Sequence, residues 1–212
     1  MAPIRVPPSS ADVSIANAIA ARTGPSTERT AQALTWGADE HILCALAAGW
    51  WVYCRNKDAG HRLASDHVLL TTLAASALPH LLKTVFDQQR PDRTTVRGHW
   101  RGVPVSGKRL DSFPSGHAVH VGALASAATV LPKNQRNMVW GVGAALVLTR
   151  IVLLAHWVSD VTIGLAVGAA IERLLRRLTG YVVSTSTWPE MRRGRCSLPA
   201  EASNTSTHRV SG

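Results

Sequence analysis

Three short clusters of polar residues, each at the edge of an apolar run, carry the side chains that could do chemistry in this chain. They span residues 83–91, 114–117 and 149–160. Together they hold three cations, two histidines, and a carboxylate four residues after a histidine. Such groups could bind a phosphate, attack it with an imidazole, and protonate the group that leaves.

The three cations are natural ligands for a phosphate group. Arg90 and Arg150 each present a planar fork of donors that can bind two phosphate oxygens, while Lys83 acts as a compact point charge. Taken alone, Lys83 could extend to a membrane surface from a helix end, and Arg90 could be a solvated charge. Arg150 lies inside an apolar run, where an ionisable residue is usually functional.

The sequence Pro-Ser-Gly-His at residues 114–117 is typical of a helix start that binds an anion. Ser115 is a good N-cap, and Gly116 lets the backbone approach a ligand closely. The free N–H groups of the first turn attract negative charge, so His117 would face a bound anion. The alternative is a capped helix start without a ligand.

His156 and Asp160 are four residues apart, which places them on one face of a helix. A carboxylate bound to one ring nitrogen fixes the imidazole tautomer and leaves the other nitrogen free as a nucleophile. The alternative is a buried His–Asp pair that locks two helices together. His80, near the end of another apolar run, is interpreted as a packed or interfacial residue and not as a catalyst.

The apolar runs that flank these clusters indicate a small polytopic membrane protein. Charged residues make up only 17% of the 212 residues, hydrophobic residues 46%, and the net charge is +10. Runs of Ala, Val, Leu and Gly alternate with Arg-rich connectors, as in membrane proteins, whereas a basic nucleic-acid-binding domain would carry more charge. We therefore expect membrane lipids as partners and no nucleic acid. The scattered Cys44, Cys54 and Cys196 predict neither a disulfide framework nor a metal site.

Five helices are expected to position the clusters. The apolar run 138–175 would measure roughly 55 Å as a single helix, against a hydrocarbon core of about 30 Å, so it must fold back near residues 150–160. The expected helices are 40–54, 63–82, 116–131, 138–152 and 157–175, with a polar connector at 86–115.

This pattern predicts that the chain is divided into three segments. Residues 39–180 form the predicted membrane domain. Residues 1–38 are expected to be polar or interfacial, with one weak helix at 10–24 that Ser10 or Asp12 could cap. Residues 181–212 are expected to form a disordered basic tail, because they lack a core-forming pattern.

The basic turns at 55–62 and 133–136, and the chain beyond Arg173, predict a topology in which these parts are cytoplasmic. The 86–115 connector and the 150–160 turn then share the opposite face. All three clusters fall on that face, although other residues determined the topology, and this agreement supports a shared site. We expect an integral membrane protein of a bacterial inner or plasma membrane, with its site on the non-cytoplasmic face.

In order and spacing, the three clusters resemble the tripartite signature of the type 2 phosphatidic acid phosphatase family. The matching patterns are Lys-x6-Arg-Pro, Pro-Ser-Gly-His and Arg-x5-His-x3-Asp, within residues 83–160. The resemblance implies an all-α polytopic membrane bundle of five to six transmembrane helices. It also implies a phosphatase without metal or cofactor that acts on a lipid phosphate or diphosphate, of the isoprenyl diphosphate, phosphatidic acid or phosphatidylglycerophosphate class.

The resemblance further implies a role for each site residue. His156 would attack phosphorus and form a phosphohistidine, Asp160 would orient His156, and His117 would protonate the leaving oxygen. The phosphate ligands would be Lys83, Arg90, Ser115, Gly116 and Arg150. Water would then release the phosphate from the enzyme.

The chain departs from the family pattern in places, and two other functions are compatible with the clusters. Thr149 stands where the family usually has Ser, and residues 151–155 lack the Gly and Pro common at this turn. One alternative is a vanadate-dependent haloperoxidase, since vanadate mimics phosphate, although such enzymes are usually soluble and larger. The other is a non-catalytic membrane anion-binding protein. The intact nucleophile, acid and carboxylate count against the latter.

Overall fold

The computed structural model of the chain describes residues 4–91 and 110–181. The predicted tail beyond residue 181 and most of the 86–115 connector lie outside the described residues. The α-helices of the described residues are α1 (Ser10–Arg22), α2 (Pro25–Thr35), α3 (Glu40–Cys54), α4 (Ala59–Val85), α6 (Gly116–Ala127), α7 (Lys133–Val152) and α8 (Val158–Thr179). Two short 3-10 helices, η1 (Trp36–Ala38) and η2 (Ala128–Val130), follow α2 and α6. Strands β1 (Ile4–Arg5) and β2 (Phe86–Asp87) pair in parallel.

The five helices expected from the apolar runs are confirmed as α3, α4, α6, α7 and α8. The bounds of α3 match the expected 40–54, whereas α4 and α7 begin earlier than expected. For α4 the reason is Asp58, whose carboxylate accepts the N–H groups of Gly60 and His61 and so caps a polar first turn. Pro132 precedes α7 and stops η2 from continuing.

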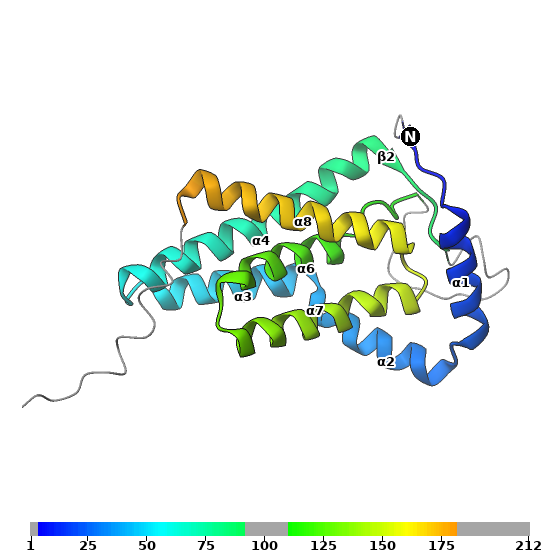
Figure 1. Cartoon of the computed structure of the whole chain (residues 1–212), viewed down its shortest axis with the longest axis horizontal. Helices are drawn as coiled ribbons and strands as arrows, with labels where there is room; N and C mark the ends of the chain where they lie inside the picture. Colours follow the sequence, from blue (N-terminus) through cyan, green and yellow to red (C-terminus); the bar gives the residue numbers. More distant parts are fainter. Residues whose placement is uncertain (1–3, 92–109, 182–212) are drawn as a thin grey trace, which may run out of the picture. The chain divides into compact units, whose positions relative to one another are not determined.

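The five helices lie side by side, and α6 packs against α8, α4 and α7 (Figure 1). The closest approach is between α6 and α8. A side chain at Gly122 would collide with the backbone of Leu165, and one at Gly168 with the backbone of Val119. These two glycines let the helix backbones meet, as small residues do between membrane helices.

Much of the helix surface is apolar. Within the described residues one helix, α4, is both long and apolar enough to cross a membrane by itself, with a mean hydropathy of 1.4 over its best window. Only 22% of that window is buried inside the bundle. Large apolar side chains are also exposed on α3 and α7, among them Leu46, Val52, Met138 and Leu148. In a membrane bundle such surfaces face lipid.

A buried polar network ties α4, α6 and α8 together in the half of the bundle far from the starts of α6 and α8. The carboxylate of Glu172 is fully buried and lies 2.9 Å from His67 Nε2. It also accepts hydrogen bonds from Ser126 Oγ at 2.7 Å and from Arg176 Nη2 at 2.6 Å. These partners satisfy a charge that would otherwise be costly to bury.

The turn between α7 and α8 reverses the chain without a glycine. Leu154 adopts a left-handed conformation, with φ of 52°, which is unfavourable for a side chain that is not glycine. It is only 1% exposed and packs against Ala16 and Trp157. Burial of this side chain thus stabilises a turn for which the local sequence gives no Gly or Pro signal.

The N-terminal part of the chain forms two helices, α1 and α2, where one weak helix was expected. The residue that caps α1 is Ser9, not Ser10 or Asp12: Ser9 Oγ accepts the N–H of Asp12, and the Asp12 carboxylate accepts the N–H of Ser9. Helix α1 packs on Leu154 and Trp157, while Ala31 of α2 packs on Leu153 and Ala155. Both helices therefore cover the α7–α8 turn (Figure 1).

Candidate active site

The three clusters meet at one end of the bundle. Helices α4 and α7 end there and α6 and α8 begin there, so Lys83, His117, Arg150 and Asp160 lie within one turn of a shared helix end (Figure 1). Two contacts join the clusters directly: Trp157 Nε1 donates to the carbonyl of Gln89 at 2.7 Å, and the N–H of Ser115 lies 3.4 Å from the carbonyl of Asp160. The three clusters, which are separate in the sequence, therefore lie together in space.

His156 lies in the α7–α8 turn and is only 4% exposed. Its Nδ1 is 2.7 Å from the carbonyl oxygen of Ser112. A carbonyl can only accept, so Nδ1 carries the proton and Nε2 of the neutral ring holds a free electron pair. Burial, followed by the positive charges of Arg150, Arg90 and Lys83, holds the pKa of His156 well below its usual 6.5. The hydrogen bond and the lowered pKa both favour the neutral form of the imidazole.

Asp160 is fully buried in the first turn of α8, and its contacts differ from those expected. The prediction of a direct hydrogen bond on a shared helix face is wrong, because His156 precedes the first residue of α8. Asp160 Oδ2 lies 3.9 Å from His156 Nδ1, within ion-pair distance only. The same oxygen accepts from Ser112 Oγ at 2.5 Å and from the N–H of Trp157 at 3.0 Å. Asp160 thus reaches His156 through Ser112, which the sequence reasoning missed.

The three cationic side chains, Arg150, Arg90 and Lys83, lie near His156. Arg150 is 5% exposed, and its Nη1 donates to Oγ1 of Thr35 at 2.8 Å, while its Nε has no partner among the described residues. Arg90 is buried and its Nε donates to Asp111 Oδ1 at 2.9 Å. Lys83 is half-buried in the last turn of α4. Sequence reasoning missed Thr35 and Asp111, since neither has a local signal.

The start of α6 differs from a simple capped helix. Ser115 occupies the N-cap position, but its hydroxyl makes no capping hydrogen bond; it is fully buried and has no partner among the described residues. A ligand oxygen would satisfy it. A Cβ at Gly116 would make an ordinary 3.8 Å contact with Pro79, so packing does not demand glycine there.

His117, in the first turn of α6, is half-buried, and its ring lies near the backbone of Thr35. His80 lies apart from this arrangement: its side chain is 66% exposed and pairs with Glu40 at 3.4 Å. That placement agrees with its interpretation as an interfacial residue.

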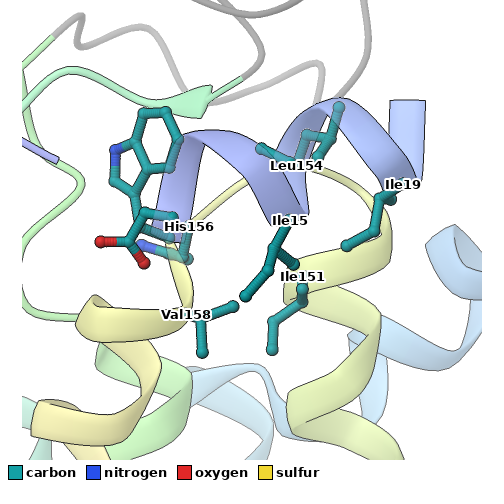
Figure 2. A pocket seen from close by; sticks show the side chains of 9 residues that line it. Ile15, Ile19, Ile151, Leu154, His156 and Val158 are labelled. Atoms are coloured by element: carbon teal, nitrogen blue, oxygen red, sulfur yellow. The ribbon is translucent and has the colours of Figure 1, made fainter. Parts of the chain in front are cut away.

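A small hollow of about 10 Å³ lies beside His156, between α1 and the α7–α8 turn. Figure 2 shows Ile15, Ile19, Ile151, Leu154 and Val158 around it. It has room for one water-sized group and none for a lipid chain. The apolar side chains on this side of His156 help to keep its ring dry.

Part of the chain is similar to two curated proteins. It is 36% identical over 104 residues to a lipid A 1-phosphatase of Rhizobium johnstonii, and 35% identical over 103 residues to a lipid A 1-phosphatase of Rhizobium etli. These matches cover 49% and 48% of this chain, and 43% and 44% of the two relatives. The matched region therefore spans less than half the length of either relative.

Two solved structures share the fold. LpxE of Aquifex aeolicus aligns with a TM-score of 0.62 at 14% identity, over 82% of this chain and 99% of that one. A transmembrane PAP2 type phosphatidylglycerolphosphate phosphatase of Bacillus subtilis aligns with a TM-score of 0.55 at 22% identity, over 82% and 86%. At these identities the likeness concerns the fold alone, which is that of a membrane helical bundle.

The family model described as the PAP2 superfamily matches residues 67–184. This range exceeds half of the 212 residues and contains all three clusters. It also contains Ser112, which links Asp160 to His156. On this match, together with the shared fold, the chain belongs to the PAP2 superfamily.

Proposed function

We propose that this protein is an integral membrane phosphatase that hydrolyses a lipid phosphate or diphosphate through a phosphohistidine intermediate. The observation that carries the proposal is the environment of His156. Its neutral ring is held through Nδ1 by the carbonyl of Ser112, and the positive charges of Arg150, Arg90 and Lys83 act on it from nearby. A nucleophilic nitrogen beside a cluster of cations fits attack on an anionic phosphorus.

The proposed reaction has two steps. In the first, the anionic substrate binds with His117 protonated. His156 Nε2 then forms a bond to phosphorus while the bond to the leaving oxygen breaks, and the His117 imidazolium gives that oxygen a proton. In the second, His117 accepts a proton from water as the water oxygen attacks phosphorus, which frees His156 and inorganic phosphate. Both histidines end in their starting states, so atoms and protons balance over the cycle.

The remaining residues stabilise charge on the transferring group. Arg150 has an unpartnered buried Nε, and Ser115 an unpartnered buried hydroxyl, among the described residues; both are donors that a phosphoryl oxygen would satisfy. The N–H groups at the start of α6 add to these, with Gly116 leaving room for them to approach the ligand. Lys83 and Arg90 complete the proposed cradle, in which the protein's own cations offset the phosphate charge.

The partial similarity to two lipid A 1-phosphatases adds a fourth substrate class, the phosphate of lipid A, to the three expected from the sequence. The test is phosphate release by the detergent-solubilised protein from phosphatidic acid, phosphatidylglycerophosphate, an isoprenyl diphosphate and lipid A. We expect release from at least one lipid of this panel. No release from any of them, with the protein folded, would contradict the proposal.

We expect this activity to persist in excess EDTA and to be inhibited competitively by vanadate. Within the described residues no three His, Cys, Asp or Glu side chains come together as metal ligands, and the cations can neutralise the phosphate. The measurement is the initial rate with and without chelator on the best substrate. Loss of activity in EDTA that a divalent ion restores would show that the reaction needs a metal.

We also propose that the active site faces away from the cytoplasm. Thr30 lies on α2, the helix that covers the α7–α8 turn, and Asn134 lies at the opposite end of α7. Both are exposed, so each can be changed to Cys after Cys44, Cys54 and Cys196 are removed. In intact cells a membrane-impermeant thiol reagent should label Thr30→Cys and spare Asn134→Cys. The reverse pattern would invert the proposed topology.

A further inference from the structure

Thr35 lies at the end of α2, more than thirty positions before the first residue that the family model matches. It is 8% exposed. Its Oγ1 accepts a hydrogen bond of 2.8 Å from Nη1 of Arg150, which lies 115 positions later in the chain. A residue outside the family motifs thus contacts a side chain that the phosphate cradle requires.

The charges near Arg150 are the cations Arg90 and Lys83 and the carboxylate of Asp111, which itself accepts a hydrogen bond from Arg90. The guanidinium is buried, and Lys83 and Arg90 belong to the same cluster. Among the described residues, the Arg150 side chain forms one hydrogen bond, which is the bond to Thr35. A guanidinium binds two phosphate oxygens only when its plane is fixed, so a neutral acceptor on Nη1 can orient it without neutralising its charge.

The backbone of Thr35 also lies near the ring of the proposed acid, His117. Packing holds Thr35 in place: Ala31, one turn earlier in α2, lies against Leu153 and Ala155 of the turn that carries His156. Asp12 of α1 adds a second attachment, because its Oδ1 accepts the N–H of Ser159 at 3.0 Å. The N-terminal helices are therefore fixed to the site at both ends.

We infer that Thr35 is a positioning residue of the active site: its hydroxyl orients the Arg150 guanidinium for phosphate binding. The expected effect of Thr35 on turnover rests on the proposed function. Its effect on anion binding can be measured without turnover. Thr35 itself contacts no reacting atom in this assignment and acts only through Arg150.

The test replaces Thr35 with valine, which has the same shape, leaves the backbone unchanged, and lacks the hydroxyl. We expect Thr35→Val to lower kcat/KM by about 10–100-fold, the range for loss of a hydrogen bond to a charged group. The inhibition constant for vanadate should rise by a similar factor. Thr35→Ser keeps the hydroxyl and should stay within about threefold of the wild type, as should the exposed control Thr30→Val on the same helix.

Two measurements separate positioning from a purely structural role. The loss in Thr35→Val should be equal for lipid and nitrophenyl phosphates, because Arg150 binds the phosphoryl group that both share. In an Arg150→Ala background, Thr35→Val should have no further effect, since its partner is gone. A loss that persists in that background, or a Thr35→Val protein within twofold of the wild type in both rate and vanadate inhibition, would overturn the inference.

Binding of vanadate and inorganic phosphate, measured as the rise in Tm with ligand, keeps this test independent of turnover. If the wild type hydrolyses no lipid, the proposed function fails. The inference about Thr35 is still decided by whether Thr35→Val loses the ligand-induced rise that Thr35→Ser retains. If the valine variant does not fold, Thr35→Ala takes its place in the same comparison.

Discussion

His156→Ala is expected to abolish turnover, with a loss of at least about 10⁴-fold on every substrate, because no other group can replace a missing nucleophile. Radiolabelled phosphate trapped on the wild type should form an acid-labile, base-stable adduct, as a phosphohistidine would. The His156→Ala protein should carry no such label. His80→Ala is the matched control, since His80 is exposed and pairs with Glu40 outside the site, and it should label as the wild type does.

A second variant distinguishes lost chemistry from lost structure. Removing the imidazole leaves the buried carbonyl of Ser112 without its donor, at a cost of about 1–3 kcal/mol. His156→Asn retains an N–H near the position of Nδ1 and has no nucleophilic nitrogen. It should match the wild type in Tm and be as inactive as His156→Ala. Label that persists in either variant would show that the nucleophile is another residue.

For His117→Ala we expect a loss of kcat/KM that depends on the leaving group of the substrate. A general acid matters most when the departing oxygen is basic, as a lipid alkoxide is, and little for a nitrophenolate. The variant should lose roughly 10²–10⁴-fold in kcat/KM on a lipid monophosphate, the usual range for general acid catalysis, and far less on a nitrophenyl phosphate. An isoprenyl diphosphate should fall between them, because its leaving phosphate is a weaker base than an alkoxide.

The measurement is kcat/KM for His117→Ala and His156→Ala on all three substrates. His156→Ala provides the comparison, since each substrate needs the nucleophile and its losses should not follow the leaving group. Equal losses for His117→Ala across the series would mean that His117 binds phosphate or supports the fold. The acid would then be sought at Asp87, which is half-buried in β2, or at Asp92, which lies outside the described residues.

The sequence was sufficient for the helices and for the convergence of the clusters. Membrane helices depend on apolar runs and length, which are local properties, so the runs at 40–54 and 138–175 were enough to predict α3 and the reversal between α7 and α8. The reversal was expected on length alone. The conformation of the turn was not predictable, because the left-handed Leu154 is stabilised by packing that includes Ala16, which is far away in the sequence.

The positioning contacts could not be read from the sequence for a related physical reason. Spacing shows which residues share a helix face, and it failed for His156 and Asp160 because His156 lies outside the helix. Ser112 holds His156 across 44 positions and Thr35 holds Arg150 across 115, and neither distance has a periodic signature. Such hydrogen bonds become visible only once the packing of the elements is known.

The attachment of α1 and α2 to the α7–α8 turn has a consequence for how the protein matures. Asp12 and Ser159 are 147 positions apart, so α1, which is synthesised before the bundle helices, contacts α8, which is synthesised after the other helices described. Contacts this distant in sequence form late, after the intervening loops have closed. Until α8 is inserted, Leu154 has a local preference against its left-handed conformation, and His156 has no fixed direction. Activity therefore requires α8, and we expect a nascent chain in which only α3 to α7 are inserted to be inactive.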